Sequence, residues 1–135
     1  MKVMIYLDTN IFIYAILDET EIGNKCRKII KNQINEKKDA STSCLTWDEV
    51  VYGIRKKMGK ENSIVQGRNL IETQNLTWLN SDILIITKSQ ELMENYNLKP
   101  RDAIHVATMI VNNIKEIISD DPDFDKVKEI KRIKI

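Results

Sequence analysis

The sequence predicts an α/β fold with three layers (α/β/α) and a mainly parallel central sheet. At 135 residues the chain has the size of one domain, so we expect a single domain over residues 1–135. Short apolar runs without polar alternation, typical of strands buried on both faces, recur between longer segments with helical periodicity. Strands separated by helices build parallel sheets through right-handed crossovers, with helices on both faces.

The first half of the chain contains two expected strands and four expected helices. Residues 2–7 (KVMIYL) form a buried-strand candidate, and Asn10 suits the N-cap of a helix over 11–17. A single apolar stripe predicts a helix over 21–37, formed by Ile22, Cys26, Ile29, Ile30 and Ile34. The remaining elements of this half are a strand over 40–43 and helices over 45–58 and 61–74, which separate near Gly59.

The second half is expected to contain three strands and two helices. Residues 76–79 form a short extended segment, after which Ser81 suits the N-cap of a helix that reaches Tyr96. Pro100 favours the first turn of a helix that runs to Asn112. The remaining elements are a strand over 116–119 (EIIS), a polar turn over 120–125 and a final strand over 130–135.

Composition limits the function. The net charge of +1 does not mark a nucleic-acid binder, so a polyanion would need a local basic face. One stretch offers such a face, through Arg55, Lys56, Lys57, Lys60 and Arg68. No run approaches the ~20 apolar residues of a membrane span, and Asp8 and Asn10 interrupt the apolar N-terminus without a following signal-peptide cleavage site. We therefore expect a cytoplasmic protein that does not act at a membrane.

Four acidic residues map to one edge of the expected sheet. Asp8 ends the first strand, and Glu49 lies in the first turns of the helix after the second strand. Asp102 lies in the first turn of the helix that leads into EIIS, and Asp121 lies two residues beyond that strand. Strand C-termini and helix N-termini share one edge of such a sheet, where ligands bind. Asp8 and Asp121 would be neighbours if the first strand pairs with EIIS.

Converging carboxylates indicate a metal site. Carboxylates that share a cleft repel one another, so either their pKa values rise or a hard cation lies among them. Mg²⁺ prefers oxygen ligands, and metals bound in this way promote in-line phosphoryl transfer. The residues alone therefore suggest metal-dependent phosphodiester hydrolysis.

Each acid also has a structural explanation. Asp8 and Asp121 could simply end strands, because Asp is common in turns. Residues 46–49 (TWDE) match a capping box, in which Glu49 would satisfy a backbone donor. Asp102 is favoured in a first helical turn by the helix dipole. The shared edge is what favours a site over these explanations.

Four ordered segments, which span essentially the whole chain, resemble the PIN-domain nucleases, and in particular the VapC-like toxins of toxin–antitoxin pairs. The first strand followed by residues 8–10 (DTN) resembles the start of the family's domain, and residues 42–54 (TSCLTWDEVVYGI) resemble its second motif, which selects Glu49 over Asp48. Residues 98–107 (LKPRDAIHVA) resemble its third motif and residues 117–124 (IISDDPDF) its fourth.

The resemblance implies a role for each matching residue. Asp8 and Asp102 would be the principal metal ligands. Glu49 would be a third carboxylate that binds the metal or its water, and Asp121 would complete the site directly or through water. Three hydrogen-bonding residues would orient these acids, namely Thr9, Asn10 and Ser119. The fourth acid is ambiguous among Asp120, Asp121 and Asp123, and the spacing to Phe124 favours Asp121.

Three further residues attract a functional interpretation. His105, the single histidine of the chain, could be a general base, but its small and apolar neighbours favour a packing or hydrogen-bonded role. Trp47 and Trp78 could stack on bases, although core or dimer packing is the favoured interpretation.

The family resemblance implies a single PIN-like nuclease domain: a Mg²⁺- or Mn²⁺-dependent endoribonuclease, usually a homodimer and often inhibited by a cognate antitoxin protein. The alternatives are a PIN-type RNA-processing nuclease outside a toxin–antitoxin pair and a catalytically silent RNA-binding or interaction module. A haloacid-dehalogenase-type phosphatase also begins with a strand that ends in Asp. That family needs a second Asp where this chain has Asn10, which argues against it.

Overall fold

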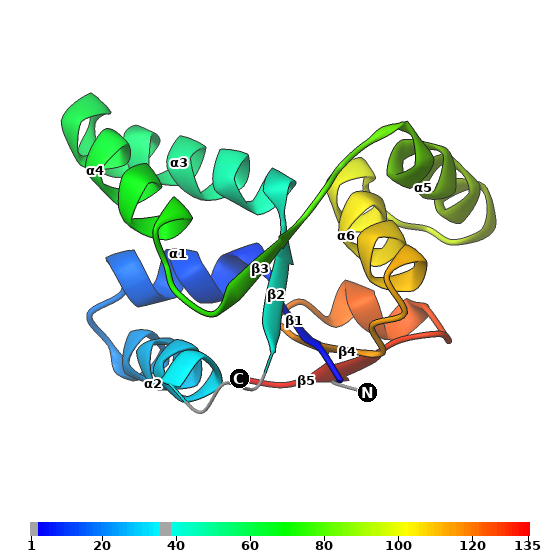
Figure 1. Cartoon of the computed structure of the whole chain (residues 1–135), viewed down its shortest axis with the longest axis horizontal. Helices are drawn as coiled ribbons and strands as arrows, with labels where there is room; N and C mark the ends of the chain where they lie inside the picture. Colours follow the sequence, from blue (N-terminus) through cyan, green and yellow to red (C-terminus); the bar gives the residue numbers. More distant parts are fainter. Residues whose placement is uncertain (1–2, 36–38) are drawn as a thin grey trace.

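The computed structural model shows one parallel sheet of five strands in the order β3-β2-β1-β4-β5 (Figure 1). The structure describes residues 3–35 and 39–135. The strands are β1 (Ile5–Leu7), β2 (Ala40–Ser43), β3 (Leu76–Leu79), β4 (Glu116–Ile118) and β5 (Lys131–Ile133). Every neighbouring pair is parallel, which confirms the predicted sheet, and β1 does pair with β4.

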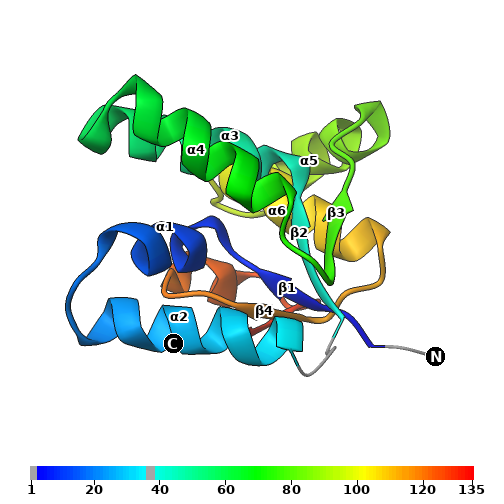
Figure 2. The same cartoon turned by 60° about the vertical axis from the view of Figure 1, so that its left-hand side comes forward.

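Helices cover both faces of this sheet. They are α1 (Thr9–Leu17), α2 (Glu21–Asn35), α3 (Cys44–Met58), α4 (Lys60–Ile71), α5 (Ile83–Asn95) and α6 (Pro100–Val111). A short 3-10 helix, η1 (Pro122–Lys126), follows β4. Helices α1 to α4 lie on one face, whereas α5, α6 and η1 lie on the other (Figures 1 and 2). The predicted three-layer α/β/α architecture is therefore confirmed.

The centre of β1 shows how the two layers of helices are built. Tyr6 and Leu7 are adjacent, both have no exposed surface, and their side chains belong to different hydrophobic clusters. Tyr6 packs in the cluster of α6 with Val106, and Leu7 packs in the cluster of α3 with Val50. Successive side chains of a strand point to opposite faces, so a continuous apolar run is what a sheet covered on both faces requires.

The structure corrects both predicted N-caps. Helix α1 begins at Thr9 and is capped by Asp8, so Asn10 lies inside the helix. Helix α5 is capped by Asp82, whereas the hydroxyl of Ser81 pairs with Ser43. In both cases an Asp carboxylate, which binds backbone N–H groups at the positive end of a helix dipole more strongly than a neutral side chain, is the cap.

Other details also differ from the prediction. Helix α4 ends at Ile71 instead of residue 74, the final strand spans Lys131–Ile133 instead of 130–135, and η1 overlaps the expected polar turn over 120–125. The predicted capping box over 46–49 is wrong, because α3 begins at Cys44 with Ser43 as its N-cap. The predicted starts and ends at residues 2 and 36–37 lie outside the described residues.

The turn between α3 and α4 is a single residue, Gly59, with a φ of 89°. Residues that carry a Cβ rarely adopt a φ in this range, which explains why a glycine separates the two helices. Within the described part of the chain, no helix combines the length and apolar character needed to cross a membrane.

Candidate active site

Asp8 is held at the end of β1 by its neighbours on two elements. Its side chain is buried, with 6% of the residue exposed. Its Oδ1 accepts a hydrogen bond from the Thr9 backbone N–H (2.8 Å), and its Oδ2 accepts one from the Ser119 hydroxyl (2.7 Å). Burial raises the pKa of Asp8 above its ordinary value, although the nearby His105 and these two hydrogen bonds oppose the rise. The carboxylate thus has a fixed orientation at the junction of β1 and β4.

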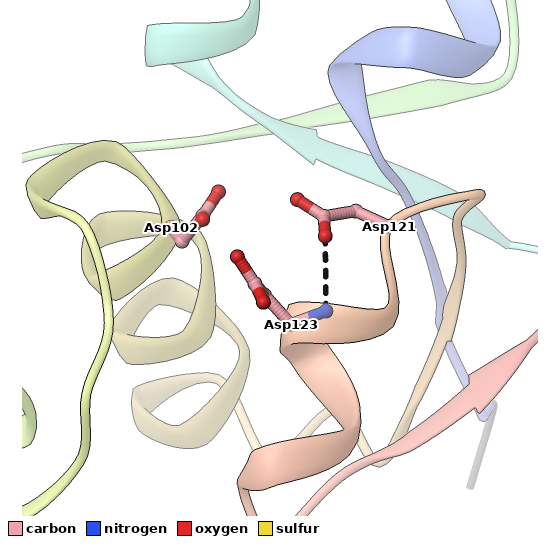
Figure 3. A group of neighbouring side chains, drawn as sticks. All are labelled: Asp102, Asp121 and Asp123. Carbon is pink, nitrogen blue, oxygen red and sulfur yellow. Dashed lines mark hydrogen bonds between the residues drawn. The ribbon is translucent and has the colours of Figure 1, made fainter.

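A group of three aspartates lies at the start of α6 and η1. One carboxylate oxygen from each of Asp102, Asp121 and Asp123 lies within 4.8 Å of the others (Figure 3). Asp102 comes from the first turn of α6, and Asp121 is the N-cap of η1. The Oδ1 of Asp121 accepts a hydrogen bond from the Asp123 backbone N–H at 2.9 Å, which fixes the turn that carries both acids (Figure 3).

The electrostatics of this group are unfavourable without a counter-ion. Burial, followed by the negative charges of Asp121 and Asp8, raises the pKa of Asp102 to about 6. Like charges at this separation disfavour full ionisation, and a divalent cation relieves the repulsion. The effect of Asp8 on Asp102 also shows that the buried carboxylate and the aspartate group form one electrostatic unit.

Glu49 enters the same region from α3. Its Oε1 accepts hydrogen bonds from the Thr9 hydroxyl (2.9 Å) and from Nε2 of His105 (2.6 Å). Burial by itself would raise the pKa of Glu49, but the hydrogen bond and charge of His105 and the bond from Thr9 outweigh it and hold the pKa below its ordinary value. Glu49 is therefore an ionised and positioned carboxylate.

These acids border an open cleft of about 490 Å³. The cleft is lined by Glu49, Lys99, Pro100, Arg101, Asp102 and Asp121. Lys99 and Arg101 are exposed and flank the N-terminus of α6, where basic side chains oppose the helix dipole. The helix dipole therefore does not account for these two cations, and their side chains are available to an anion that enters the cleft.

The structure brings the four acids chosen from the sequence to one edge of the sheet. Glu49, Asp102 and Asp121 line the cleft, and Asp8 lies buried beside them. The hydroxyl of Thr9 donates a hydrogen bond to Glu49, and the hydroxyl of Ser119 donates one to Asp8. Asn10 differs, because its buried Oδ1 has no hydrogen-bond partner within residues 3–35 and 39–135.

Sequence reasoning treated Asp121 and Asp123 as competing choices, whereas both approach Asp102. The spacing of the two acids could have indicated this joint approach. Two acids separated by one proline at the start of a 3-10 turn can place their carboxylates in the same region. His105 is buried and hydrogen-bonded, which matches the interpretation favoured from its neighbours.

The donor set fits a divalent cation. Three carboxylates can each offer an oxygen to a common centre, and hard cations such as Mg²⁺ and Mn²⁺ prefer such ligands. The pKa of Asp102 is raised by burial and by neighbouring negative charges, and a bound cation would offset both effects.

The fold and the cleft together define an α/β protein with a metal-compatible acidic site at the carboxyl edge of its sheet. The family model of the PIN domain matches residues 5–130. The chain therefore belongs to the PIN-domain family of nucleases. A comparison with curated protein sequences gave no match.

Solved structures share this fold at low sequence identity. DNA-bound VapBC from Salmonella typhimurium matches with a TM-score of 0.76 and 17% identity, over 98% of both chains. The sarcin–ricin loop cleaving toxin VapC20 from Mycobacterium tuberculosis matches with a TM-score of 0.74 and 14% identity, over 90% of this chain and 92% of that one. A toxin–antitoxin complex from Klebsiella pneumoniae matches with a TM-score of 0.68 and 22% identity, over 93% and 94%.

Proposed function

We propose that this protein is a Mg²⁺- or Mn²⁺-dependent endoribonuclease and the toxin of a VapBC-type pair. The observation that carries the proposal is the convergence of Glu49, Asp102 and Asp121 on one cleft whose rim bears Lys99 and Arg101. An acidic centre with a basic rim suits a phosphodiester, because the centre takes the cation and the rim takes the phosphate backbone.

The cation would be held by Asp102, Asp121 and Asp8, with Asp123 as a further donor. When bound, it supplies a Lewis acid that lowers the pKa of water and neutralises charge on the phosphate. Ser119 and the Thr9 backbone keep both oxygens of Asp8 oriented. These hydrogen bonds fix the buried ligand before substrate arrives.

The residues on the cleft wall act on the substrate and its water. Glu49 is ionised and acceptor-only, so its carboxylate can accept a hydrogen bond from a water in the cleft. Lys99 and Arg101 neutralise the phosphate backbone across the mouth of the same cleft.

The toxin assignment rests on the kind of structures that share the fold. Matches from Salmonella typhimurium and Haemophilus influenzae are VapBC structures, and the Mycobacterium tuberculosis protein is described as cleaving the sarcin–ricin loop. We extend the antitoxin partner and the RNA substrate to this chain on that basis, and the homodimer on the family resemblance alone. Sedimentation of the purified chain tests the homodimer, which a purely monomeric profile would contradict.

Cleavage of RNA tests the activity directly. Purified protein is incubated with single-stranded and structured RNA in Mg²⁺, in Mn²⁺ and in chelator, beside Asp8→Asn and Asp48→Asn variants. Asp48 is the matched control, because it adjoins Glu49 on α3 but is exposed and outside the cleft. We expect cleavage by the wild type and by Asp48→Asn in metal only, and none by Asp8→Asn. Cleavage that persists in chelator, or no cleavage of any RNA, would refute the proposal.

Growth distinguishes a toxin from an RNA-processing nuclease. Induced expression of the wild type in a bacterial host should arrest growth, whereas Asp8→Asn should not. Co-expression of an antitoxin from an adjacent reading frame should restore growth. An active nuclease that leaves growth unchanged would favour the RNA-processing role.

A further inference from the structure

A buried hydrogen-bonded path leads from the sheet to the Glu49 carboxylate. The phenol oxygen of Tyr6 lies 2.5 Å from Nδ1 of His105, and Nε2 of His105 lies 2.6 Å from Oε1 of Glu49. Tyr6 lies in β1, His105 in α6 and Glu49 in α3. The path therefore joins the central sheet to helices from both of its faces.

The chemistry of these groups fixes the direction of the bond between His105 and Glu49. An ionised carboxylate only accepts, so Nε2 of His105 must carry the hydrogen and donate it to Glu49. The Tyr6 hydroxyl can donate or accept, so it satisfies Nδ1 in either charge state of the ring: it donates to Nδ1 of a neutral ring and accepts from Nδ1 of a cationic one. The Glu49 carboxylate therefore requires the hydrogen on Nε2, and Tyr6 completes the hydrogen bonding of His105 in that orientation.

The burial of Tyr6 and His105 argues against a role in packing alone. Tyr6 has no exposed surface and His105 has 1%, and their rings meet edge to face with centroids 5.7 Å apart. A buried polar ring costs free energy unless its nitrogens are bonded, and an apolar side chain of similar volume would fill the same space without that requirement. Both ring nitrogens are satisfied, and one of them is directed at a carboxylate of the cleft.

We propose that Tyr6 and His105 are positioning residues that hold the Glu49 carboxylate in its working orientation. This inference rests on the proposed nuclease function only for its kinetic consequence. The hydrogen bonds themselves are independent of that function. Thr9 supports the same oxygen from α1 through its hydroxyl, so Glu49 is fixed from two directions.

The single histidine of the chain makes the arrangement directly measurable. In tag-free, ¹⁵N-labelled, metal-free protein, every imidazole signal in a long-range proton–nitrogen spectrum belongs to His105. We expect a hydrogen on Nε2, a downfield-shifted Nε2 proton, and loss of that downfield shift in Glu49→Ala. We also expect Tyr6→Phe to move the Nδ1 resonance. A ring without a hydrogen on Nε2, or a spectrum unchanged in both variants, would overturn the proposal.

Kinetics separate positioning from packing. His105→Leu removes both hydrogen bonds, so we expect kcat to fall about 10- to 100-fold with little change in KM. His105→Gln keeps a side-chain donor and an acceptor and should recover most of that loss. Met109→Ala is the matched control, because Met109 lies one turn further along α6, is fully buried and packs in the hydrophobic cluster of α6. It should lower the unfolding temperature and keep kcat when assayed well below that temperature.

The outcomes distinguish this inference from the proposed function. Wild-type kcat in His105→Leu, or an equal loss in His105→Gln and Met109→Ala, would overturn the positioning role even if the wild type is an active nuclease. If the wild type cleaves no RNA, the proposed function fails, and the His105 spectrum still decides whether Tyr6 and His105 hold Glu49.

Discussion

The substitution Asp102→Asn should stabilise the metal-free protein at neutral pH while it destroys the site. Asp102 shares its surroundings with Asp121 and Asp8, and burial and these charges raise its pKa from 3.8 to about 6. An amide occupies the same volume without the charge. The variant therefore removes the repulsion that a cation would otherwise relieve.

The size of this effect follows from the pKa shift. A rise from 3.8 to about 6 corresponds to about 3 kcal/mol at pH 7. The side chain is partly exposed, so solvent screening reduces this, and the lost interaction with the α6 dipole costs about 0.5 kcal/mol. We expect a net gain of about 1 to 2 kcal/mol, or about 3 to 8 °C in the unfolding temperature of a domain of this size.

The pH dependence has a definite sign. Because the folded-state pKa of Asp102 lies above its unfolded value, the folded state binds more protons between about pH 4 and pH 6. The free energy of unfolding of the wild type therefore falls as the pH rises from about 4 to about 6, because Asp102 becomes ionised in the folded protein. The variant has no carboxyl group at this position and does not show this fall. Near pH 3.5 Asp102 is protonated in the folded state, so the two proteins should be close in stability there and diverge as the pH rises.

Thermal unfolding in chelator, followed across this pH range, measures the effect, and Asp48→Asn controls for the loss of an exposed acid. Addition of Mg²⁺ at pH 7 should raise the unfolding temperature of the wild type and of Asp48→Asn, but not that of Asp102→Asn. A variant that is no more stable than the wild type at pH 7 in chelator would refute the account of charge repulsion.

Three further predictions concern other parts of the molecule. Ser119→Ala leaves Oδ2 of the buried Asp8 without its donor, so the free energy of unfolding should fall by about 1 to 3 kcal/mol in urea titrations, and an unchanged value would show that this bond is dispensable. Arg101→Ala should raise KM for RNA several-fold and weaken its salt dependence with little change in kcat, and a change confined to kcat would assign Arg101 a different role. Gly23→Ala should destabilise the fold by about 2 kcal/mol or more, because a Cβ there would lie 2.0 Å from the Asp18 carbonyl oxygen, and a wild-type unfolding temperature would contradict that close approach.

The sequence was sufficient for the elements that local pattern determines. Residues 40–43 and 76–79 are strands over the predicted ranges, and Pro100 begins the predicted helix. The edge shared by the acids also follows from the sequence, because parallel strands place their C-termini together. The sequence alone therefore predicts that Asp8 and Asp102 lie near one another.

What the sequence could not supply depends on packing between distant segments. The bond between His105 and Glu49 joins residues 56 positions apart, and no local pattern sets its geometry. The choice of Asp8 over Asn10 as the cap of α1 depends on competition between two side chains two positions apart, both of which are good caps. The joint approach of Asp121 and Asp123 to Asp102 depends on η1, which forms where the sequence predicts only a polar turn.

The central claim is that a divalent cation binds among the carboxylates of Asp8, Asp102 and Asp121. A crystal of the protein grown or soaked in Mn²⁺, with anomalous diffraction data collected at the manganese edge, tests it most directly. The account predicts an anomalous peak bounded by Asp8, Asp102 and Asp121, at about 2.0 to 2.2 Å from at least two of their oxygens. No peak in that cleft at millimolar Mn²⁺, or a peak only elsewhere on the surface, would contradict it.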